Sequence, residues 1–297
     1  MIDGKPCEDA TRVVHLKTAT IVAVADGHGD HRCVFAHIGS KLAAKAACEA
    51  LKSYNGKIKN EDPSTYWNSR RTEIAKCVVQ TFSRFVFSDY ITRCPEVVSP
   101  EEQKEIFDHI NGMYAMNREA CTPDEIRKRY AQKKRAGDKL RQILYLYGTT
   151  VRASLVTDKY MFHMALGDGD TTILVQDSVE WVLPKSEAYE CETASLCEDP
   201  EEVLNDFVFS YTELRQNDHV AEKLDDVGIC PQMLILSTDG LRNSFYSERA
   251  FADKLYAIYK YATEGKFDRS KRNLKNLLTS LSRNSAYQDD ISITLTM

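Results

Sequence analysis

The sequence lacks the features that mark three large classes of protein. No apolar run is long enough to cross a bilayer, so a membrane-spanning chain is not expected. The first residues, MIDGKPCEDATRVV, contain no basic region followed by an apolar stretch, so a secretory signal is not expected either. Basic residues are not in excess, because 39 lysines and arginines face 44 aspartates and glutamates, and the net charge is −5. The overall charge therefore gives no support to nucleic-acid binding.

The cysteines lack the arrangement of a disulfide framework or of a cysteine zinc site. There are nine of them, scattered along 297 residues, and no two form a CxxC pair. This pattern is typical of reduced thiols, and it predicts a cytoplasmic protein. Internal repeats and low-complexity segments are also absent. With 43% hydrophobic residues, the chain is long enough for one large domain with a sizeable core.

Strand-like segments lie toward both ends of the chain. Two short runs rich in β-branched residues come early in the chain, RVVHL (12–16) and TIVAVAD (20–26). Two apolar runs come late, MLILSTDGL (233–241) and QDDISITLTM (288–297). After Gly148 the hydrophobic period is two, and three strand-like runs separated at 157–159 and 167–170 predict an antiparallel meander. Residues 185–230 are acidic and show no clear pattern.

Helices are predicted between these strands and near the end of the chain. A step of four in apolar residues predicts a helix face made by Val34, Ile38, Leu42, Ala46 and Ala50. The segment from about 54 to 147 is almost entirely helical, and one amphipathic helix is indicated by Trp67, Ile74, Val78, Phe82 and Phe85. Capping boxes at SPEE and TPDE mark two helix starts, at Ser99 and Thr122. Two more helices are expected at about 245–263 and 270–284.

The order of these elements favours the α+β class. Parallel βαβ alternation is absent, so we expect antiparallel sheets covered by helices. Strands from both ends of the chain would then share one core. We therefore expect a single domain over residues 1–297, with an enlarged helical segment at about 54–147.

Acidic residues recur where the predicted strands begin or end. They are Glu8, Asp9, Asp26, Asp168, Asp239, Asp289 and Asp290. Acids at strand ends can converge at one rim of a sheet, where they repel one another unless cations lie between them. Mg²⁺ and Mn²⁺ are the hard divalent cations that prefer oxygen ligands. Two such ions can clamp a phosphate and activate water, so the pattern indicates phosphate chemistry.

Each of these signals also has a simpler interpretation. Asp-Gly is a common hairpin turn, although Asp26-Gly27 leads into a helical pattern and the dipeptide recurs after other buried strands. His28 and His31 have H-x-x-H spacing, but no cysteine or third histidine lies near them, which disfavours zinc. His28 is better interpreted as a general acid beside the metals. Thr149 and Thr150 are interpreted as the start of a strand.

Five motifs in order resemble the metal-dependent serine/threonine protein phosphatases of type 2C, in particular their bacterial-style branch. They are VADGHG before an alanine-rich helix, YGTT before a strand pair, ALGDGD, LILSTDGL and DDISIT, preceded by GKPCEDA. The resemblance implies a four-layer α-β-β-α sandwich of two antiparallel sheets flanked by helices. It also implies two Mg²⁺ or Mn²⁺ ions, hydrolysis of phosphoserine and phosphothreonine in proteins by metal-activated water, and no phospho-enzyme.

The resemblance also implies roles for individual residues. Asp26 would bridge both metals, the Gly27 carbonyl would bind one of them, and Asp239 and Asp289 would complete the first site. Three further acids match positions around the metals: Glu8 and Asp9 near the second metal, and Asp168 at a third, weaker one. His28 matches the general acid for the leaving serine or threonine oxygen.

Two positions depart from the family pattern. Some members carry an arginine shortly before the acidic pair that grips the phosphate, whereas this chain has DGKPCED, where Lys5 would be a substitute without bidentate geometry. The asparagine that usually follows the last metal acid is Asp290 here, which keeps an oxygen ligand and adds charge.

Two alternatives for the function stay open at this point. A catalytically weak regulatory or binding protein of the same fold is suggested by the missing arginine and the unusual helical segment. A small-molecule phosphohydrolase is the other, because the metal site does not choose the substrate. The basic run RKRYAQKKRAGDK (127–139) is interpreted as a solvated helix face, with docking of acidic or phosphorylated partners as the functional alternative.

Overall fold

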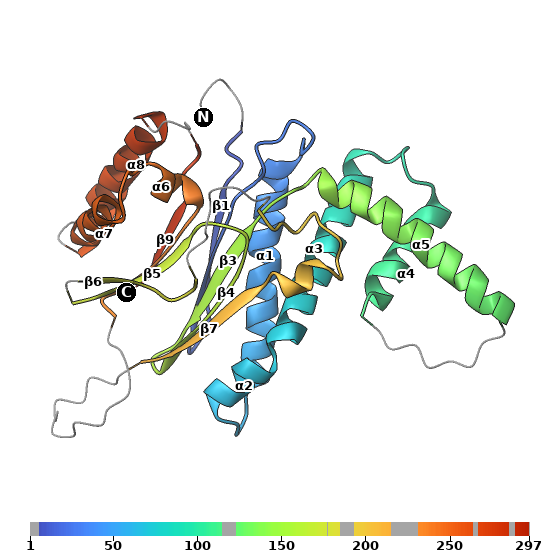
Figure 1. Cartoon of the computed structure of the whole chain (residues 1–297), viewed down its shortest axis with the longest axis horizontal. Coiled ribbons are helices and arrows are strands. Elements are labelled where there is room, and N and C mark those ends of the chain that lie inside the picture. The colour runs from blue at the N-terminus through green and yellow to red at the C-terminus, as the bar shows by residue number, and fades with distance from the viewer. Residues whose placement is uncertain are drawn as a thin grey trace.

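The computed structural model describes residues 6–114, 123–176, 178–184, 193–214, 231–263, 267–284 and 289–296. Two antiparallel sheets lie face to face, and helices cover the outer face of each (Figure 1). The predicted α+β sandwich in four layers is therefore confirmed. Each sheet contributes one end of its strands to the rim where the predicted acidic residues lie.

The first sheet has five strands in the order β1-β2-β3-β4-β7. Their bounds are β1 Ala10–His15, β2 Thr20–Ala25, β3 Val151–Val156, β4 Tyr160–Leu166 and β7 Val208–Glu213. In the central strand β3, Arg152 pairs with Val24 on one side and with Ala165 on the other. Strand β7 and a short 3-10 helix at Val203–Asn205 lie in the segment 185–230, for which no secondary structure was predicted.

The second sheet has four strands in the order β6-β5-β8-β9. Their bounds are β5 Asp170–Val175, β6 Ser178–Trp181, β8 Met233–Ser237 and β9 Ile293–Thr296. The predicted meander is wrong, because β3 and β4 belong to the first sheet while β5 and β6 belong to the second. The predicted third run is in fact the hairpin of β5 and β6, which turns at Gln176 with a φ of 53°. Period-two alternation is the same in both sheets, so it cannot show where the chain changes sheet.

The helices on the outer side of the first sheet come from the predicted helix that begins near Val34 and from the predicted helical segment at about 54–147; α4 and α5 pack against α3 and lie farther from the sheet (Figure 1). Their bounds are α1 Ala36–Asn55, α2 Pro63–Ser69, α3 Arg71–Arg93, α4 Pro100–Gly112 and α5 Pro123–Tyr145. The predicted single helix from Trp67 to Phe85 is wrong, because Arg70 has non-helical dihedrals (φ −107°, ψ 5°) that separate α2 from α3. The capping box at Ser99 is confirmed, whereas Thr122 lies outside the described residues.

Helix α1 lies directly against the first sheet, as the alanine-rich pattern predicts. Its first residue is Ala36, so Val34 is not part of the helix and is 57% exposed, contrary to the predicted face. At Gly39 an added Cβ would lie 2.0 Å from the Tyr147 carbonyl oxygen. The helix therefore approaches the chain before β3 so closely that only glycine fits.

Helices α6 Asp239–Asn243, α7 Glu248–Thr263 and α8 Phe267–Asn284 cover the second sheet (Figure 1). The two longer ones agree with the predicted segments, and α6 was not predicted. None of the described helices has the length and apolar character needed to cross a bilayer. The six cysteines in the described part of the chain are free thiols.

Alternate residues of each central strand face different cores. On β2, Ile21 and Ala23 pack under helix α1, while Val22 and Val24 pack between the sheets with Leu236 of β8. The space between the sheets also holds polar side chains, among them Ser154 and His163. The Ser154 hydroxyl lies 2.7 Å from Nδ1 of His163.

The buried imidazole of His163 makes stability depend on pH. Complete burial lowers the pKa of His163 from 6.5 to about 3. Between pH 6.5 and pH 3, His163 is protonated in the unfolded chain but neutral in the folded chain. The stability that the neutral, buried His163 contributes is therefore fully present above pH 6.5 and is lost as the pH falls toward 3.

We expect the free energy of unfolding of wild type to fall by about 2 kcal/mol more than that of His163→Gln between about pH 7 and about pH 5. Urea unfolding at both pH values measures the difference. His15→Gln, on the exposed edge strand β1, is the matched control and keeps the wild-type pH dependence. Equal pH dependence in wild type and His163→Gln would contradict the prediction.

Candidate metal centre

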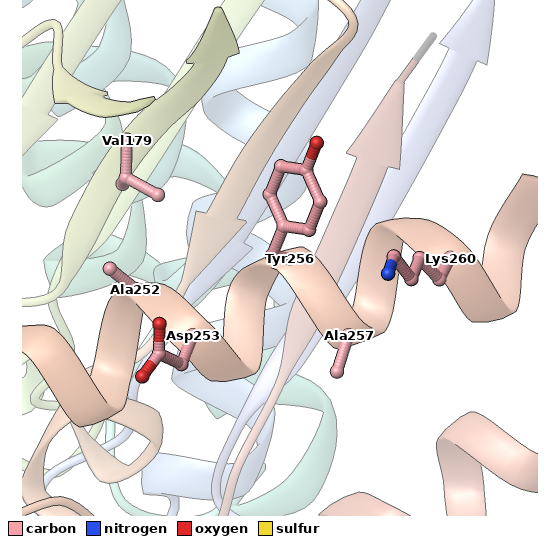
Figure 2. A pocket seen from close by; sticks show the side chains of 6 residues that line it. All are labelled: Val179, Ala252, Asp253, Tyr256, Ala257 and Lys260. Atoms are coloured by element: carbon pink, nitrogen blue, oxygen red, sulfur yellow. The ribbon is translucent and has the colours of Figure 1, made fainter. Parts of the chain in front are cut away.

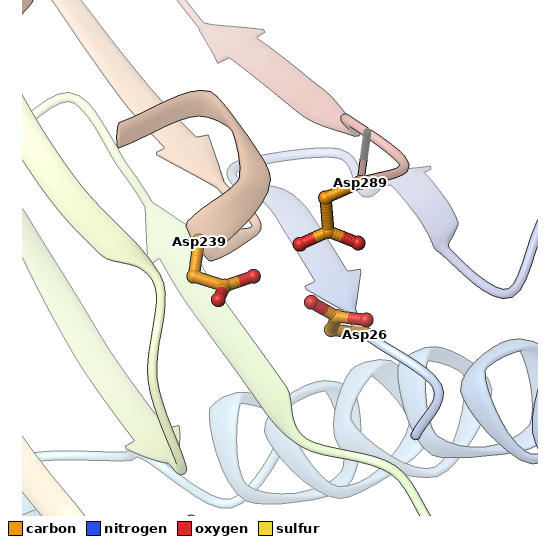
Figure 3. A group of neighbouring side chains, drawn as sticks. All are labelled: Asp26, Asp239 and Asp289. Carbon is orange, nitrogen blue, oxygen red and sulfur yellow. The ribbon is translucent and has the colours of Figure 1, made fainter. Parts of the chain in front are cut away.

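Three aspartates from distant parts of the chain meet at the rim of the two sheets. Asp26 follows β2, Asp239 begins α6 directly after β8, and Asp289 precedes β9. Figure 3 shows the three side chains directed toward a common space. One carboxylate oxygen of each residue lies within 4.8 Å of those of the other two. The strand ends therefore do bring these predicted residues together.

A cavity of about 200 Å³ opens at the three aspartates. It is lined by Glu8, Asp26, Gly27, His28, Gly29, Thr150, Asp168, Thr193, Asp239, Asp289 and Asp290. Among these described residues six are acids, and only His28 has a side chain that can become positive. Such a cavity attracts cations.

Burial and mutual repulsion disfavour ionisation of these acids in the absence of a cation. Burial, followed by the charges of Asp9 and Asp239, raises the pKa of Asp26 well above its usual range. Burial and the charge of Asp239 raise the pKa of Asp289 to about 7. Burial likewise raises the pKa of Asp168, with Asp239 again adding to the effect. A divalent cation would relieve this repulsion and restore the charged forms.

Asp9 lies beneath the cavity and is 6% exposed. Its Oδ2 accepts a hydrogen bond of 2.8 Å from the Thr238 hydroxyl. Its Oδ1 and Oδ1 of Asp239 are buried without a hydrogen-bond partner among the described residues. Burial raises the pKa of Asp9 to about 6. Unpartnered buried carboxylate oxygens in an all-oxygen cluster fit Mg²⁺ or Mn²⁺.

Glu8 and Asp290 lie side by side at the mouth of the cavity. The Glu8 amide donates a hydrogen bond of 2.9 Å to Oδ2 of Asp290. Asp290 therefore supports the segment that carries the acidic pair. Lys5, the predicted phosphate ligand, lies outside the described residues.

The backbone around Asp26 is fixed by two threonines. The Thr149 hydroxyl and the Thr150 amide donate hydrogen bonds of 2.7 and 2.8 Å to the Asp26 carbonyl. The Thr150 hydroxyl accepts one of 3.2 Å from the Asp26 amide. At the next residue, Gly27, an added Cβ would lie 2.7 Å from the Glu8 carbonyl oxygen. The YGTT motif thus does more than begin a strand, because it holds the first acid in place.

Three further residues support the site, and sequence motifs point to them only indirectly. Thr238, inside LILSTDGL, contacts Asp9 and accepts a hydrogen bond of 3.0 Å from the Ser292 amide. Thr193 donates a hydrogen bond of 3.1 Å to Oδ2 of Asp168. Arg152 donates to the backbone of the turn that carries Asp168. Each lies next to a motif acid in space, but only Thr238 is next to one in sequence.

His28 and His31 do not form a common site. The His28 amide donates a hydrogen bond of 3.0 Å to the Gly148 carbonyl, and His28 is one of the residues that line the cavity. Burial lowers the pKa of His28, while Asp30 acts in the opposite direction. The His31 side chain is 92% exposed and pairs with Asp30 at 3.2 Å. The structure therefore gives no support to zinc at this pair.

A second hollow, of about 370 Å³, lies along α7 beside β6 (Figure 2). It is lined by Val179, Ala252, Asp253, Tyr256, Ala257 and Lys260. A single carboxylate and a single ammonium group line it, so it lacks the acid cluster that a divalent metal needs.

Comparison with known proteins identifies the family. The family described as protein phosphatase 2C matches residues 1–279. The chain belongs to the protein phosphatase 2C family. The resemblance seen in the motifs is therefore confirmed, and so is the predicted enzyme class, a protein serine/threonine phosphatase.

Solved structures of bacterial phosphatases share the fold of this protein phosphatase 2C member. The S. agalactiae serine/threonine phosphatase is 14% identical, with a TM-score of 0.51, covering 98% of this chain and 93% of that one. The Staphylococcus aureus serine/threonine phosphatase Stp1 is 13% identical, with a TM-score of 0.50, covering 98% and 88%. A bacterial serine phosphatase is 14% identical, with a TM-score of 0.51, covering 98% and 91%. No curated protein matches the chain.

The repulsion within the acid cluster predicts an effect on stability. We expect Asp289→Asn to raise the thermal midpoint of the metal-free chain by about 2–4 °C, because one repelling charge is removed. Added Mn²⁺ should stabilise wild type more than the variant, since the variant binds the ion less well. Differential scanning fluorimetry with chelator or with Mn²⁺ measures both effects.

Asp158→Asn, in the exposed turn between β3 and β4, is the matched control and should change neither midpoint. A metal-free Asp289→Asn chain that melts below wild type would argue against repulsion at the rim.

Proposed function

We propose that this chain hydrolyses phosphoserine and phosphothreonine in proteins with two Mg²⁺ or Mn²⁺ ions at the rim of its sheets. The observation that carries the proposal is the meeting of Asp26, Asp239 and Asp289, whose oxygens lie within 4.8 Å of one another. Family membership supports the reaction, and the all-oxygen donor set supports the choice of metals. Bound there, the ions would supply an activated water and charge stabilisation of the phosphate.

The acidic residues of the site and the Gly27 carbonyl divide into three groups. Asp26, the Gly27 carbonyl, Asp239 and Asp289 would hold the two ions. Asp9, which is buried and contacts Thr238, would act from outside the cavity lining, and Asp168 would help to hold a third ion. Glu8 and Asp290 would orient coordinated waters, because they line the mouth of the cavity.

His28 would donate a proton to the leaving serine or threonine oxygen. His28 lines the cavity together with Asp26. Among the described lining residues, its side chain is the one that can carry a positive charge and then donate a proton. An alkoxide is a poor leaving group, so protonation of its oxygen during bond cleavage lowers the barrier. The acids themselves are needed in their charged form to hold metal.

The substrate is a phosphoprotein, as the family indicates. The family match does not favour the regulatory or the small-molecule alternative. Lys5 stays a predicted phosphate ligand. Docking of acidic partners on the basic helix at 127–139 also stays a prediction, supported by the exposure of Lys133 and Lys134, although Arg135 already pairs with Glu105 at 2.6 Å.

We also propose that residues 1–297 form one domain with an enlarged helical segment at about 54–147. The proposal is supported by contacts of β9 with β1 and β2, which join the two ends of the chain. A cytoplasmic location stays a prediction that the free thiols support.

The metal-dependent reaction predicts a large effect of the rim acids. We expect Mn²⁺-dependent hydrolysis of p-nitrophenyl phosphate and of a phosphothreonine peptide, and a loss of at least about 100-fold in Asp26→Asn and Asp239→Asn, because each removes a metal ligand. Initial rates at several Mn²⁺ concentrations measure this loss.

Asp253→Asn is the matched control, since Asp253 lines the second hollow on α7 and not the metal centre. It should retain wild-type rates. If wild type shows no Mn²⁺-dependent turnover above the two rim variants on either substrate, the proposed function is wrong. A panel of phosphometabolites beside the peptide decides between protein and small-molecule substrates.

The role of His28 predicts an effect that depends on the leaving group. We expect His28→Gln to slow hydrolysis of a phosphothreonine peptide by about 100-fold or more, because an alkoxide needs a general acid. Hydrolysis of p-nitrophenyl phosphate should be slowed much less, since nitrophenolate leaves without a proton. Values of kcat for both substrates give the comparison, and equal losses would exclude the role as an acid.

A further inference from the structure

A charged arginine lies in the interior directly behind the metal centre. Arg152 is on the central strand β3 and is 3% exposed. Its strand neighbours are Val24, two residues before Asp26, and Ala165, three residues before Asp168. A buried guanidinium is costly unless its donors are satisfied, so its partners indicate why it is there.

Within the described part of the chain, two of the three hydrogen bonds of Arg152 go to one turn, the segment 167–169 between β4 and β5. Nε donates a hydrogen bond of 2.9 Å to the Asp168 carbonyl, and Nη2 donates one of 3.1 Å to the Gly167 carbonyl. Gly167 and Gly169 have φ values of 85° and 104°, a conformation that suits only glycine. The turn therefore wraps around the planar guanidinium group, which fixes the direction of both carbonyls.

The turn presents Asp168 to the metal centre. The Asp168 carboxylate lines the cavity and accepts a hydrogen bond of 3.1 Å from Thr193. Its main chain is held from the interior by Arg152, and its side chain is held from the loop by Thr193. These two contacts together determine where the carboxylate lies.

A simple buried ion pair would not explain this geometry. Asp170, at the start of β5 in the second sheet, is close enough for its charge to act on Arg152. Its Oδ1, however, accepts a hydrogen bond of 2.8 Å from the Trp181 indole and pairs with Arg242 at 3.7 Å. The hydrogen bonds of Arg152 go instead to the turn carbonyls and, at 3.5 Å, to the Thr171 hydroxyl. The planar guanidinium group of Arg152 thus fits the two carbonyl groups of the turn that carries Asp168.

We propose that Arg152 is a positioning residue for the divalent ion that Asp168 helps to hold. The guanidinium shapes the turn 167–169 from inside the sandwich and so sets the direction of the Asp168 carboxylate toward the cavity. The affinity of that ion then depends on a residue that does not touch it. This inference rests on the proposed function, because it assigns Asp168 to a metal.

Mn²⁺ binding to the purified chain, measured by isothermal titration calorimetry, tests the inference. Asp168→Asn first identifies which class of Mn²⁺ sites depends on this acid. We expect Arg152→Lys to weaken the same class by about 10–100-fold, and Arg152→Gln to weaken it more, because lysine keeps the charge but loses the planar fork. In the double variant Arg152→Lys with Asp168→Asn, the second change should add little, since both act on one ion.

Ser154→Ala is the matched control. Ser154 lies on the same face of the same strand as Arg152, and its hydroxyl contacts His163 and not the turn. It should lower the thermal midpoint yet leave the Mn²⁺ isotherm as in wild type. Comparison with the Arg152 variants then separates a general loss of core packing from a loss of Asp168 positioning.

The outcomes distinguish the inference from the proposed function. A folded Arg152→Lys chain with the wild-type isotherm, or weakening that adds fully to that of Asp168→Asn, overturns the inference while the proposed function stands. If Arg152→Gln does not fold, Arg152→Lys alone decides. A wild-type chain that binds no Mn²⁺ overturns both.

Discussion

The acids at the rim of the sheets are held close together against the mutual repulsion of their carboxylates. Asp26, Asp239 and Asp289 are placed within 4.8 Å of one another although burial and like charge raise the pKa of Asp26 and of Asp289. Such an arrangement is unfavourable for an isolated protein and becomes favourable once doubly charged cations lie between the acids. The fold must therefore hold the acids in place before any cation binds.

Hydrogen bonds to the main chain and from threonine hydroxyls hold the rim in place. Two threonines hold the Asp26 main chain, and Thr238 connects Asp9 with the segment before β9. Gly27 allows the chain to pass close to the Glu8 carbonyl. The threonine hydroxyls and backbone groups in these contacts carry no charge, so they add no repulsion to the acid cluster. They can therefore hold together acids that would otherwise move apart.

Arg152 and His163 are polar side chains buried between the two sheets, one charged and one neutral. Arg152 places one positive group behind an acidic cavity, and its hydrogen bonds go to the turn that carries Asp168. His163, deeper between the sheets, stays neutral, because burial lowers its pKa to about 3. Among the described residues between the sheets, the charged Arg152 therefore lies beside the rim, and the neutral pair of Ser154 and His163 lies farther from it.

The class of fold, the acids at the strand ends and the family could be predicted from the sequence, because an apolar strand followed by Asp-Gly is a pattern of neighbouring residues. The sequence did not predict that β3 and β4 lie in a different sheet from β5 and β6, that α2 and α3 separate at Arg70, or that β7 completes the first sheet. Alternation and helical periodicity are the same whichever sheet or helix a segment joins. The contacts of Thr193 and Arg152 with the Asp168 turn were equally beyond the sequence, since Thr193 follows Asp168 by 25 positions and Arg152 precedes it by 16.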